Sequence, residues 1–324
     1  MTNIGIIGCG KMAGAHINTL MHFDDAKITA VCDVDEAKRL AAAETAAANA
    51  YADYAEMLEK EELSLVIICL PPAMHGDCVR YCAGKGVNVF IEKPMGIDSA
   101  DCRSMIEACK ENGVKLFVGH MQRYSRENQI AKELVESGKY GKLVAIHEVR
   151  QSQYPNPVSS PKWLMDRRVS GGGMMYNLGA HTIDMAQYIS GSCVSLAECS
   201  ASFTESGSEN MASGFLKLEN GVAVTFNLIG SCDVKRYEIT LYLTEGEIRI
   251  NPSLTVSACG KDGEFKTIAS WETTYANGMK DTWQYLQFCD VFEALKNGAI
   301  KVSGEYGLGI IETMEKLYKS AGRN

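Results

Sequence analysis

The chain has 324 residues, 46% of them hydrophobic and 22% charged, a composition that favours a folded protein of about two domains. Its 32 basic and 40 acidic side chains give a formal net charge of −8, which disfavours nucleic acid and anionic membranes as partners. Because it has no apolar run of about 18 residues and no basic leader, we expect a cytoplasmic protein. The 12 cysteines form no C-x-x-C pair, and we expect reduced thiols.

Short β-branched runs alternate with longer helical patterns over residues 1–120. This rhythm is typical of a parallel sheet covered by helices, and uninterrupted apolar strands fit a sheet that is buried on both faces. We therefore predict a doubly wound α/β domain over residues 1–120. The predicted strands are Ile4–Ile7, Ile28–Cys32, Leu65–Cys69, Val87–Ile91 and Lys115–Val118, and the predicted helices are Met12–Met21, Asp35–Ala48, His75–Ala83 and Ser99–Glu111.

Apolar and polar residues alternate in several segments after residue 120, which indicates strands with one face toward solvent. We predict an α+β domain over residues 121–324, with a large, mostly antiparallel open sheet built from hairpins. The loop Tyr154–Arg168 holds three of the seven prolines and is a candidate substrate lid. The predicted strands are Met211–Leu218, Val222–Leu228, Tyr237–Leu243 and Glu247–Ile250, and two closing helices are Thr282–Lys296 and Glu305–Lys319.

The segment Gly8-Cys9-Gly10-Lys11-Met12-Ala13 lies between the first predicted strand and the first predicted helix. It matches the G-x-G-x-x-A pattern of dinucleotide-binding domains, in the strand-turn-helix context that this pattern requires. Gly8 allows the tight turn, Gly10 lets the backbone approach a pyrophosphate, and the helix amides from Lys11 and Met12 onward face the anion. A glycine turn without a ligand is the alternative interpretation.

Asp33 ends the second predicted strand, about 20 residues beyond the glycines, where a carboxylate accepts hydrogen bonds from the adenosine ribose. The same charge repels a 2′-phosphate, so we expect NAD rather than NADP. Lys38 and Arg39, one helical turn later, keep NADP as the less favoured cofactor. A simple turn residue is the alternative role for Asp33.

The tetrapeptide Ile91-Glu92-Lys93-Pro94 closes the fourth predicted strand, and several other motifs accompany it. With them, the chain resembles the glucose-fructose oxidoreductase / inositol dehydrogenase / MocA (Gfo/Idh/MocA) family of NAD(P)-dependent oxidoreductases. The resemblance implies a Rossmann domain followed by a substrate domain, and it adds Pro71, His75, Glu92 and Lys93 to the expected cofactor contacts. For His75, which the strand order also places near the cofactor edge, a purely structural role is favoured at least equally. The accompanying motifs are Pro71-Pro72, Ala83–Val87, Val118–Tyr124, Trp163 and Gly171-Gly172-Gly173.

The segment Gly171–Asp184 resembles the family helix G-G-G-x-x-x-D-x-G-x-H-x-x-D, with Asn177 where the family dehydrogenases usually carry an aspartate. Asn177, His181 and Asp184 are spaced four and then three residues apart, so they lie on one helical face. We expect this face to meet the substrate. The alternative is a buried face on which the histidine only satisfies a backbone carbonyl.

The resemblance implies a dehydrogenase that transfers a hydride between NAD and a secondary alcohol or ketone carbon of a sugar or cyclitol. In this mechanism His181 accepts the hydroxyl proton and Lys93 stabilises the developing alkoxide, while Asn177 and Asp184 orient the substrate or the histidine. Asp184, Trp163, Arg168 and Tyr237 are further substrate candidates, and no H-E-x-x-H or H-x-H pattern predicts a metal site.

Relatives resembling this family form homodimers or homotetramers, and we expect the same here. Two other functions remain open. One is a redox-assisted enzyme that retains NAD and cleaves or eliminates a glycosidic bond, and the other is a non-catalytic NAD-binding regulator. The sequence does not identify the sugar, the oxidised carbon or the direction of the reaction.

Overall fold

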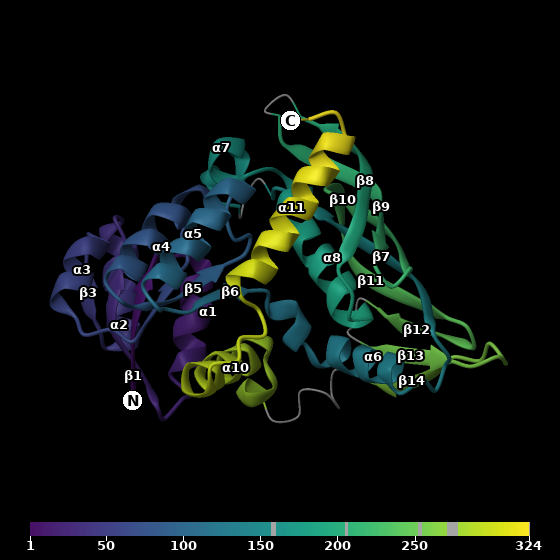
Figure 1. Ribbon diagram of the computed structural model, residues 1–324, viewed down its shortest axis with the longest axis horizontal. Helices are drawn as coiled ribbons and strands as arrows, with labels where there is room; N and C mark the ends of the chain where they lie inside the picture. Colours follow the sequence, from purple (N-terminus) through teal and green to yellow (C-terminus); the bar gives the residue numbers. More distant parts are fainter. Residues whose placement is uncertain (157–159, 205–206, 252–254, 271–277, 324) are drawn as a thin grey trace. The chain divides into compact units, whose positions relative to one another are not determined.

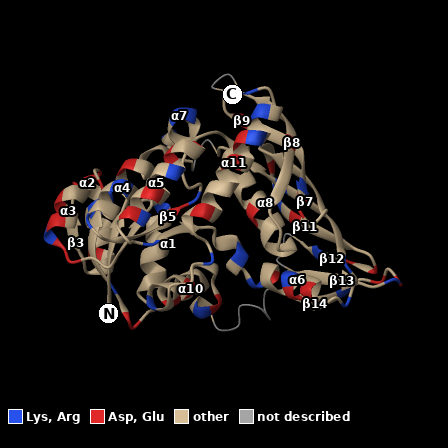
Figure 2. Ribbon diagram, in the orientation of Figure 1, with Lys and Arg blue, Asp and Glu red and all other residues tan. Residues whose placement is uncertain are grey.

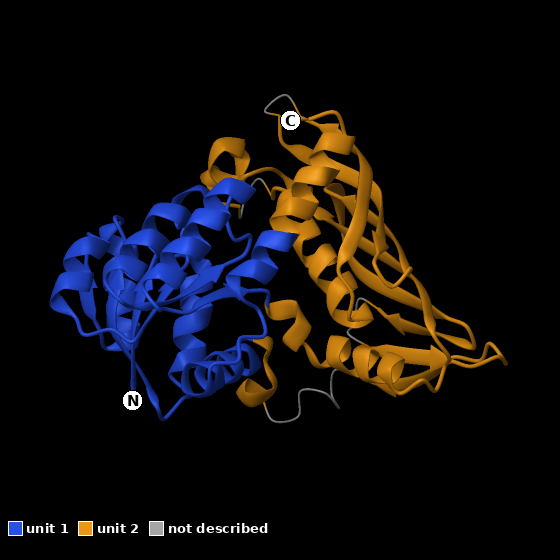
Figure 3. Cartoon of the chain, in the orientation of Figure 1, with its two compact units in different colours: residues 1–120, 284–309 blue, residues 121–283, 310–324 orange. Residues whose placement is uncertain are grey.

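The computed structural model describes residues 1–156, 160–204, 207–251, 255–270 and 278–323 (Figure 1). The chain forms two compact units (Figure 3): one comprises Met1–His120 and Gln284–Gly309, and the other comprises Met121–Trp283 and Ile310–Asn324. The sequence analysis assigned residues 284–309 to the second domain. They belong to the first unit because a C-terminal helix packs on its sheet.

The first unit is built on a six-stranded parallel sheet with helices between its strands, which confirms the predicted doubly wound fold. In spatial order the strands are β3 (Asn49–Tyr51), β2 (Ala26–Cys32), β1 (Thr2–Ile7), β4 (Leu65–Ile68), β5 (Asn88–Glu92) and β6 (Leu116–Gly119). The helices are α1 (Lys11–Leu20), α2 (Glu36–Ala46), α3 (Tyr54–Lys60), α4 (His75–Gly84) and α5 (Ser99–Glu111), with a 3₁₀ turn η1 (Pro72–Met74). The edge strand β3 and helix α3 were not predicted, because β3 has only three residues and none is buried.

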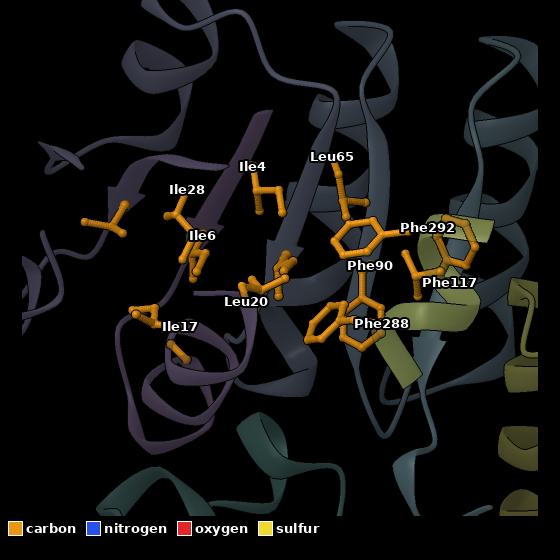
Figure 4. Packing of buried hydrophobic residues seen from close by; sticks show 14 of the residues in the cluster. Ile4, Ile6, Ile17, Leu20, Ile28, Leu65, Phe90, Phe117, Phe288 and Phe292 are labelled. Atoms are coloured by element: carbon orange, nitrogen blue, oxygen red, sulfur yellow. The ribbon is translucent and has the colours of Figure 1, made fainter. Parts of the chain in front are cut away.

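The core of the first unit joins segments from both ends of the chain (Figure 4). Strands β1, β4 and β5 contribute side chains such as Ile6 and Phe90, which are almost completely buried. Helix α10 (Trp283–Asn297) places Phe288, Val291 and Phe292 against them. These three residues follow the i, i+3, i+4 spacing of one helical face. Burying each large apolar side chain contributes roughly 1.5–3 kcal/mol, which keeps this late helix with the N-terminal sheet.

The second unit contains an eight-stranded, mostly antiparallel sheet, as predicted, with one parallel pair, β7 with β10. Helix α8 (Met174–Ser190) packs on β7, β9 and β10 (Figure 1). In spatial order the strands are β14 (Lys266–Ala269), β13 (Val256–Cys259), β12 (Gly246–Ile250), β11 (Ser231–Leu243), β7 (Leu143–Gln153), β10 (Ala223–Ile229), β9 (Glu209–Leu218) and β8 (Val194–Phe203). The other helical elements of the described residues are η2 (Met121–Tyr124), α6 (Arg126–Glu136), η3 (Lys162–Met165), α7 (Arg167–Ser170), η4 (Gly278–Asp281) and α11 (Gly304–Ser320), which begins in the first unit.

The central strand β7 was not predicted. Its inward positions are occupied by Ile146, Glu148 and Arg150, and the two charged residues hide the apolar alternation that marks a strand. Glu148 and Arg150 are buried as a hydrogen-bonded ion pair, so their polar groups are satisfied by each other and not by solvent. Within the described ranges, no helix is long and apolar enough to span a bilayer.

Candidate functional site

The glycine loop between β1 and α1 has the shape of a phosphate cradle. Gly8 has φ +87°, and a Cβ there would lie 2.8 Å from the carbonyl oxygen of Cys69, so only glycine fits. Gly10 precedes α1 without a side-chain cap, and nothing lies within 4 Å of the place where its Cβ would be. The first amides of α1, beginning at Lys11 and Met12, are therefore open to an anion. These residues fit the pyrophosphate of a dinucleotide.

Asp33 is oriented by the glycine loop itself. Its Oδ2 accepts a hydrogen bond from the backbone nitrogen of Cys9 over 2.7 Å, and its Oδ1 accepts one from the nitrogen of Asp35 over 2.9 Å. The carboxylate is therefore held beside the loop at the end of β2, with further lone pairs for a ribose hydroxyl. Arg39 donates a hydrogen bond from Nη1 to the carbonyl oxygen of Asp33 over 2.8 Å. Sequence analysis placed Arg39 one helical turn after Asp33, and the structure shows that its guanidinium reaches back to the backbone of Asp33 at the end of β2.

The thiol of Cys9 lies in the same loop. Burial, together with the neighbouring charge of Asp33, raises its pKa to about 12. At neutral pH the side chain is therefore a protonated thiol and adds no negative charge beside the phosphate cradle.

Glu92 is tied to a histidine that sequence analysis did not single out. Its Oε1 lies 2.7 Å from Nε2 of His16, which is completely buried on α1, and its Oε2 accepts a hydrogen bond from the backbone nitrogen of Lys93 over 3.2 Å. Burial acts to raise the pKa of Glu92, but the hydrogen bond and charge of His16 outweigh it and lower the pKa. These two hydrogen bonds link α1 to the end of β5, and the cofactor contact of Glu92 stays a prediction.

His75 is held by the backbone around it. Its ring is completely buried, with Nδ1 3.0 Å from the carbonyl oxygen of Met95 and Nε2 2.8 Å from that of Leu70. Both nitrogens face backbone oxygens, which favours the structural alternative for His75, and its cofactor contact stays a prediction. Pro71 immediately precedes η1, in the loop that His75 holds. Burial lowers the pKa of His75.

Lys93 directly follows β5 and is partly exposed. Its peptide bond to Pro94 is cis. The first unit therefore carries the glycine loop, Asp33 and Lys93, all at the carboxyl ends of parallel strands or just beyond them, where ligands of open α/β sheets bind.

In the second unit, Glu209 fixes the glycine run that opens α8. Its Oε1 accepts hydrogen bonds from the backbone nitrogens of Gly173, over 2.8 Å, and Tyr176, over 3.2 Å. This carboxylate sits at the positive end of the helix dipole, although burial raises its pKa. A Cβ on Gly173 would lie 2.0 Å from the carbonyl oxygen of Glu209, which explains the glycine. No local sequence signal identifies Glu209, because it acts from β9.

Asn177 and His181 lie one turn apart on α8. Asn177 is partly exposed and donates a hydrogen bond from Nδ2 to the hydroxyl oxygen of Tyr154 over 2.9 Å. His181 is only 4% exposed. Burial raises the pKa of Tyr154, so its hydroxyl is protonated at neutral pH. Sequence analysis named Tyr154 only as the start of a loop, and the hydrogen bond from Asn177 adds it to the candidate residues.

Asp184, the third residue of the predicted face, is engaged elsewhere. It is completely buried and forms an ion pair with Arg123, which links α8 to η2, and its expected contact with substrate stays a prediction. Tyr237 is likewise committed to packing, because the guanidinium of Arg150 lies 4.2 Å from the centre of its ring. Arg150 in turn pairs with Glu148. Burial raises the pKa of Glu148.

Trp163 and Arg168 lie near the end of the predicted lid, in η3 and α7, and both are exposed. Arg168 donates from Nη2 to Oδ2 of Asp166 over 2.8 Å. Residues 157–159 of the same loop lie outside the described residues. Among the residues the structure describes, no group of three or more His, Cys, Asp or Glu side chains could hold a metal ion.

The parallel sheet with helices between its strands, together with the glycine loop that opens α1, defines a Rossmann-type dinucleotide-binding fold joined to a second, α+β domain. The chain belongs to the Gfo/Idh/MocA family: residues 2–120 match its oxidoreductase family, NAD-binding Rossmann fold profile, and residues 128–249 match the GFO/IDH/MocA C-terminal domain.

Two relatives and one solved structure illustrate the similarity. Myo-inositol 2-dehydrogenase of Thermotoga maritima is 34% identical over 189 residues, which cover 58% of this chain and 54% of the relative. The 2,7-anhydro-N-acetylneuraminate hydratase of Escherichia coli is 25% identical over 280 residues, covering 84% and 74%. The WlbA dehydrogenase of Bordetella pertussis, solved with NADH and UDP-GlcNAcA, superposes with a TM-score of 0.86 at 21% identity, covering 99% and 95%. The chain spans about half the length of the first curated relatives that it matches.

Proposed function

We propose that this protein is an NAD(H)-dependent dehydrogenase acting on a secondary alcohol or ketone carbon of a sugar, sugar derivative or cyclitol. The observation that carries the proposal is the pairing of Asn177 with Tyr154 one helical turn from His181, in a chain whose first unit has an open phosphate cradle. In this arrangement the imidazole of His181 can accept a proton, and the neutral side chains of Asn177 and Tyr154 can form hydrogen bonds with substrate hydroxyls. The inositol dehydrogenase relative supports a polyol substrate.

In the proposed site the glycine loop, with Gly8, Gly10 and the amides of Lys11 and Met12, holds the pyrophosphate, and Asp33 holds the adenosine ribose. NAD supplies the hydride acceptor when bound. His181 takes the proton of the reacting hydroxyl, and Lys93 donates a hydrogen bond to the same oxygen as negative charge develops there.

Tyr154 and Asn177 have a positioning role in this scheme. Because the amide of Asn177 donates to the phenol oxygen, the O–H of Tyr154 is directed to another acceptor, such as a substrate hydroxyl. We assign both residues to holding the substrate rather than to proton transfer. Asp184 and Tyr237 support the helix and sheet behind them.

A panel of polyols and keto-sugars, assayed by NADH absorbance, tests the proposal. We expect turnover with at least one cyclitol or aldose, and we expect it to be lowered by orders of magnitude in a Lys93→Met variant that still binds NAD. Measurable NAD affinity without turnover of any panel member would instead favour a regulatory NAD-binding protein.

A second candidate is a redox-assisted enzyme that retains its cofactor, which is favoured by the similarity to the anhydro-neuraminate hydratase over 84% of this chain. Its signature is NAD that survives gel filtration, together with conversion of an anhydro-sugar or glycoside without net NADH. Net NADH formation proportional to oxidised sugar would rule it out.

We also propose a homodimer or homotetramer. On the solvent side of the central strands, His147 lies 2.8 Å from Thr225, and Ser213 donates to Asn227 over 2.7 Å. This face is polar, so self-association there would rest on hydrogen bonds as well as apolar contacts. Light scattering tests it, because a mass near 35.3 kDa at micromolar concentration corresponds to a monomer.

A further inference from the structure

A basic pocket lies in the second unit, and its lining does not include Asn177 or His181. Its volume is about 610 Å³, within the range that holds a small molecule. Four of its seven lining residues are basic and one is acidic, although the chain as a whole carries a net charge of −8. Figure 2 shows basic residues on α7 and beside the C-terminus. The lining residues are Lys162, Met165, Asp166, Arg167, Arg168, Gly207 and Arg323.

Only one of the four cations in this basic pocket is neutralised within it. Arg168 donates to both carboxylate oxygens of Asp166, over 3.0 and 2.8 Å. Among the residues that the structure describes, no carboxylate lies within ion-pair distance of the other three basic residues, Lys162, Arg167 and Arg323. An excess of positive charge therefore remains in a concave surface.

Two of these cations are held in place by aromatic rings. The guanidinium of Arg167 lies 5.4 Å from the centre of the Tyr318 ring, and that of Arg323 lies 4.4 Å from the centre of Phe203. A guanidinium over a ring keeps its N–H groups in its own plane, so they stay available to a ligand. Such a preorganised pair suits a carboxylate or phosphate, which accepts two parallel hydrogen bonds from one arginine.

The basic pocket is connected to the start of α8. Tyr318, which supports Arg167, packs so closely on Gly172 that a Cβ there would lie 1.9 Å from the tyrosine oxygen. Ser170 at the end of α7 donates to the carbonyl oxygen of Gly172 over 2.7 Å. Gly172 belongs to the glycine run that opens the helix of Asn177 and His181. A ligand in the pocket is therefore coupled to that helix by direct contacts.

We propose that the basic pocket binds an oxyanion, either a carboxylate or a phosphate, and that this oxyanion is a substituent of the sugar substrate. The second half of the proposal rests on the proposed dehydrogenase function, and the first half does not. A free anion such as inorganic phosphate shares the chemistry and is the other source to distinguish.

Calorimetric titration tests the binding site. D-glucose 6-phosphate and D-glucuronate are titrated into protein saturated with NAD⁺, so that the glycine loop cannot supply the anion site, and neutral D-glucose is the reference. We expect Arg167→Gln and Arg323→Gln each to weaken the binding of the charged probes about tenfold. Arg249→Gln is the matched control, since Arg249 also lies over a ring, Phe265, at 3.9 Å but on a distant strand. No binding of either charged probe, or equal affinities in the wild type and in both arginine variants, would overturn the site.

Kinetics identify the source of the anion. If it is a substrate substituent, the two arginine variants lower kcat/KM for charged sugars and leave it unchanged for neutral ones. Titration of inorganic phosphate is the other arm: tight phosphate binding with unaltered discrimination between charged and neutral sugars would overturn the substrate assignment. Intact anion binding without turnover of any sugar would mean that the proposed function, and not the site, is wrong. Melting temperatures of all variants, compared with Arg249→Gln, check the fold.

Discussion

Asn177 donates its side-chain hydrogen bond to the hydroxyl oxygen of Tyr154, 23 residues earlier in the chain, over 2.9 Å. The donor is an amide at the helix position where the resembling dehydrogenases usually carry an aspartate. A carboxylate could only accept a hydrogen bond there, so the phenol proton would point toward residue 177. With asparagine, the phenol proton is free to hold a substrate hydroxyl, and the site carries one negative charge fewer.

Replacing Asn177 by aspartate tests this relationship. An added anion favours the protonated form of nearby acids, so Asn177→Asp should raise the pKa of the basic limb in the pH profile of kcat for alcohol oxidation. The measurement uses saturating NAD⁺, and Tyr154→Phe in both backgrounds shows whether the phenol is involved. Identical profiles for wild type and Asn177→Asp would mean that position 177 affects substrate fit alone.

Lys93→Met and His181→Ala should each lower kcat by roughly 10²–10⁴-fold, because general acid-base groups contribute about that much. NAD affinity, measured by fluorescence titration, should stay nearly unchanged. His22→Ala is a suitable control, since His22 is exposed just beyond the end of α1 and has no role in the proposed site. Near-wild-type kcat in either site variant is incompatible with the role assigned to that residue.

Gly10→Ala should separate cofactor binding from folding. The backbone at Gly10 has φ −80°, which any residue adopts, and its Cβ would meet no protein atom within 4 Å. The melting temperature should stay unchanged. The affinity for NAD should fall about tenfold or more, because the added methyl group occupies the space that the pyrophosphate needs.

The control is Gly14→Ala on the same helix, where a Cβ also meets nothing within 4 Å. This change should stabilise α1 by about 0.5–1 kcal/mol and leave NAD affinity intact. Equal NAD affinities in the two alanine variants would remove the glycine loop from the cofactor site.

Glu92→Gln should destabilise the protein at neutral pH by about 1–3 kcal/mol, because the charge that pairs with buried His16 is lost. Since the folded protein lowers the pKa of Glu92 below its ordinary 4.5, this contribution is present above that pH and disappears as the pH falls through the folded pKa. Melting curves of both proteins should therefore converge in acid. Glu56→Gln, at an exposed pair with Lys60, should change little at any pH. A stability gap for Glu92→Gln that is constant down to strongly acidic pH would contradict the assignment.

Asp33 should set the cofactor preference. We expect a higher kcat/KM with NAD⁺ than with NADP⁺, and Asp33→Ser should shift the ratio toward NADP⁺ because the repulsion of a 2′-phosphate is removed. Arg39 already bonds the carbonyl oxygen of residue 33, so Asp33→Ser combined with Arg39→Gln should lose part of this gain. A wild-type preference for NADP⁺ would reverse the interpretation of Asp33.

Local patterns in the sequence predicted the parallel sheet, the glycine loop and the shared face of α8. Each depends on residues close together in the chain: apolar runs on β1 and β4 are buried on both sides, Gly8 needs a positive φ, and Asn177 and His181 are one turn apart whatever surrounds the helix. These features can be predicted from the sequence because the local backbone geometry alone fixes how the residues involved are placed relative to one another.

Partners far apart in the chain were decided only by the tertiary structure. Helical spacing placed Asp184 beside His181, but Arg123, 61 residues earlier, buries its carboxylate. His16 meets Glu92 across 76 residues, and α10 returns to the N-terminal sheet because Phe288 and Phe292 are buried there. A sequence pattern states which side chains share a face, whereas burial and hydrogen-bond partners, which decide whether a polar group is structural or free for chemistry, depend on what the fold packs against that face.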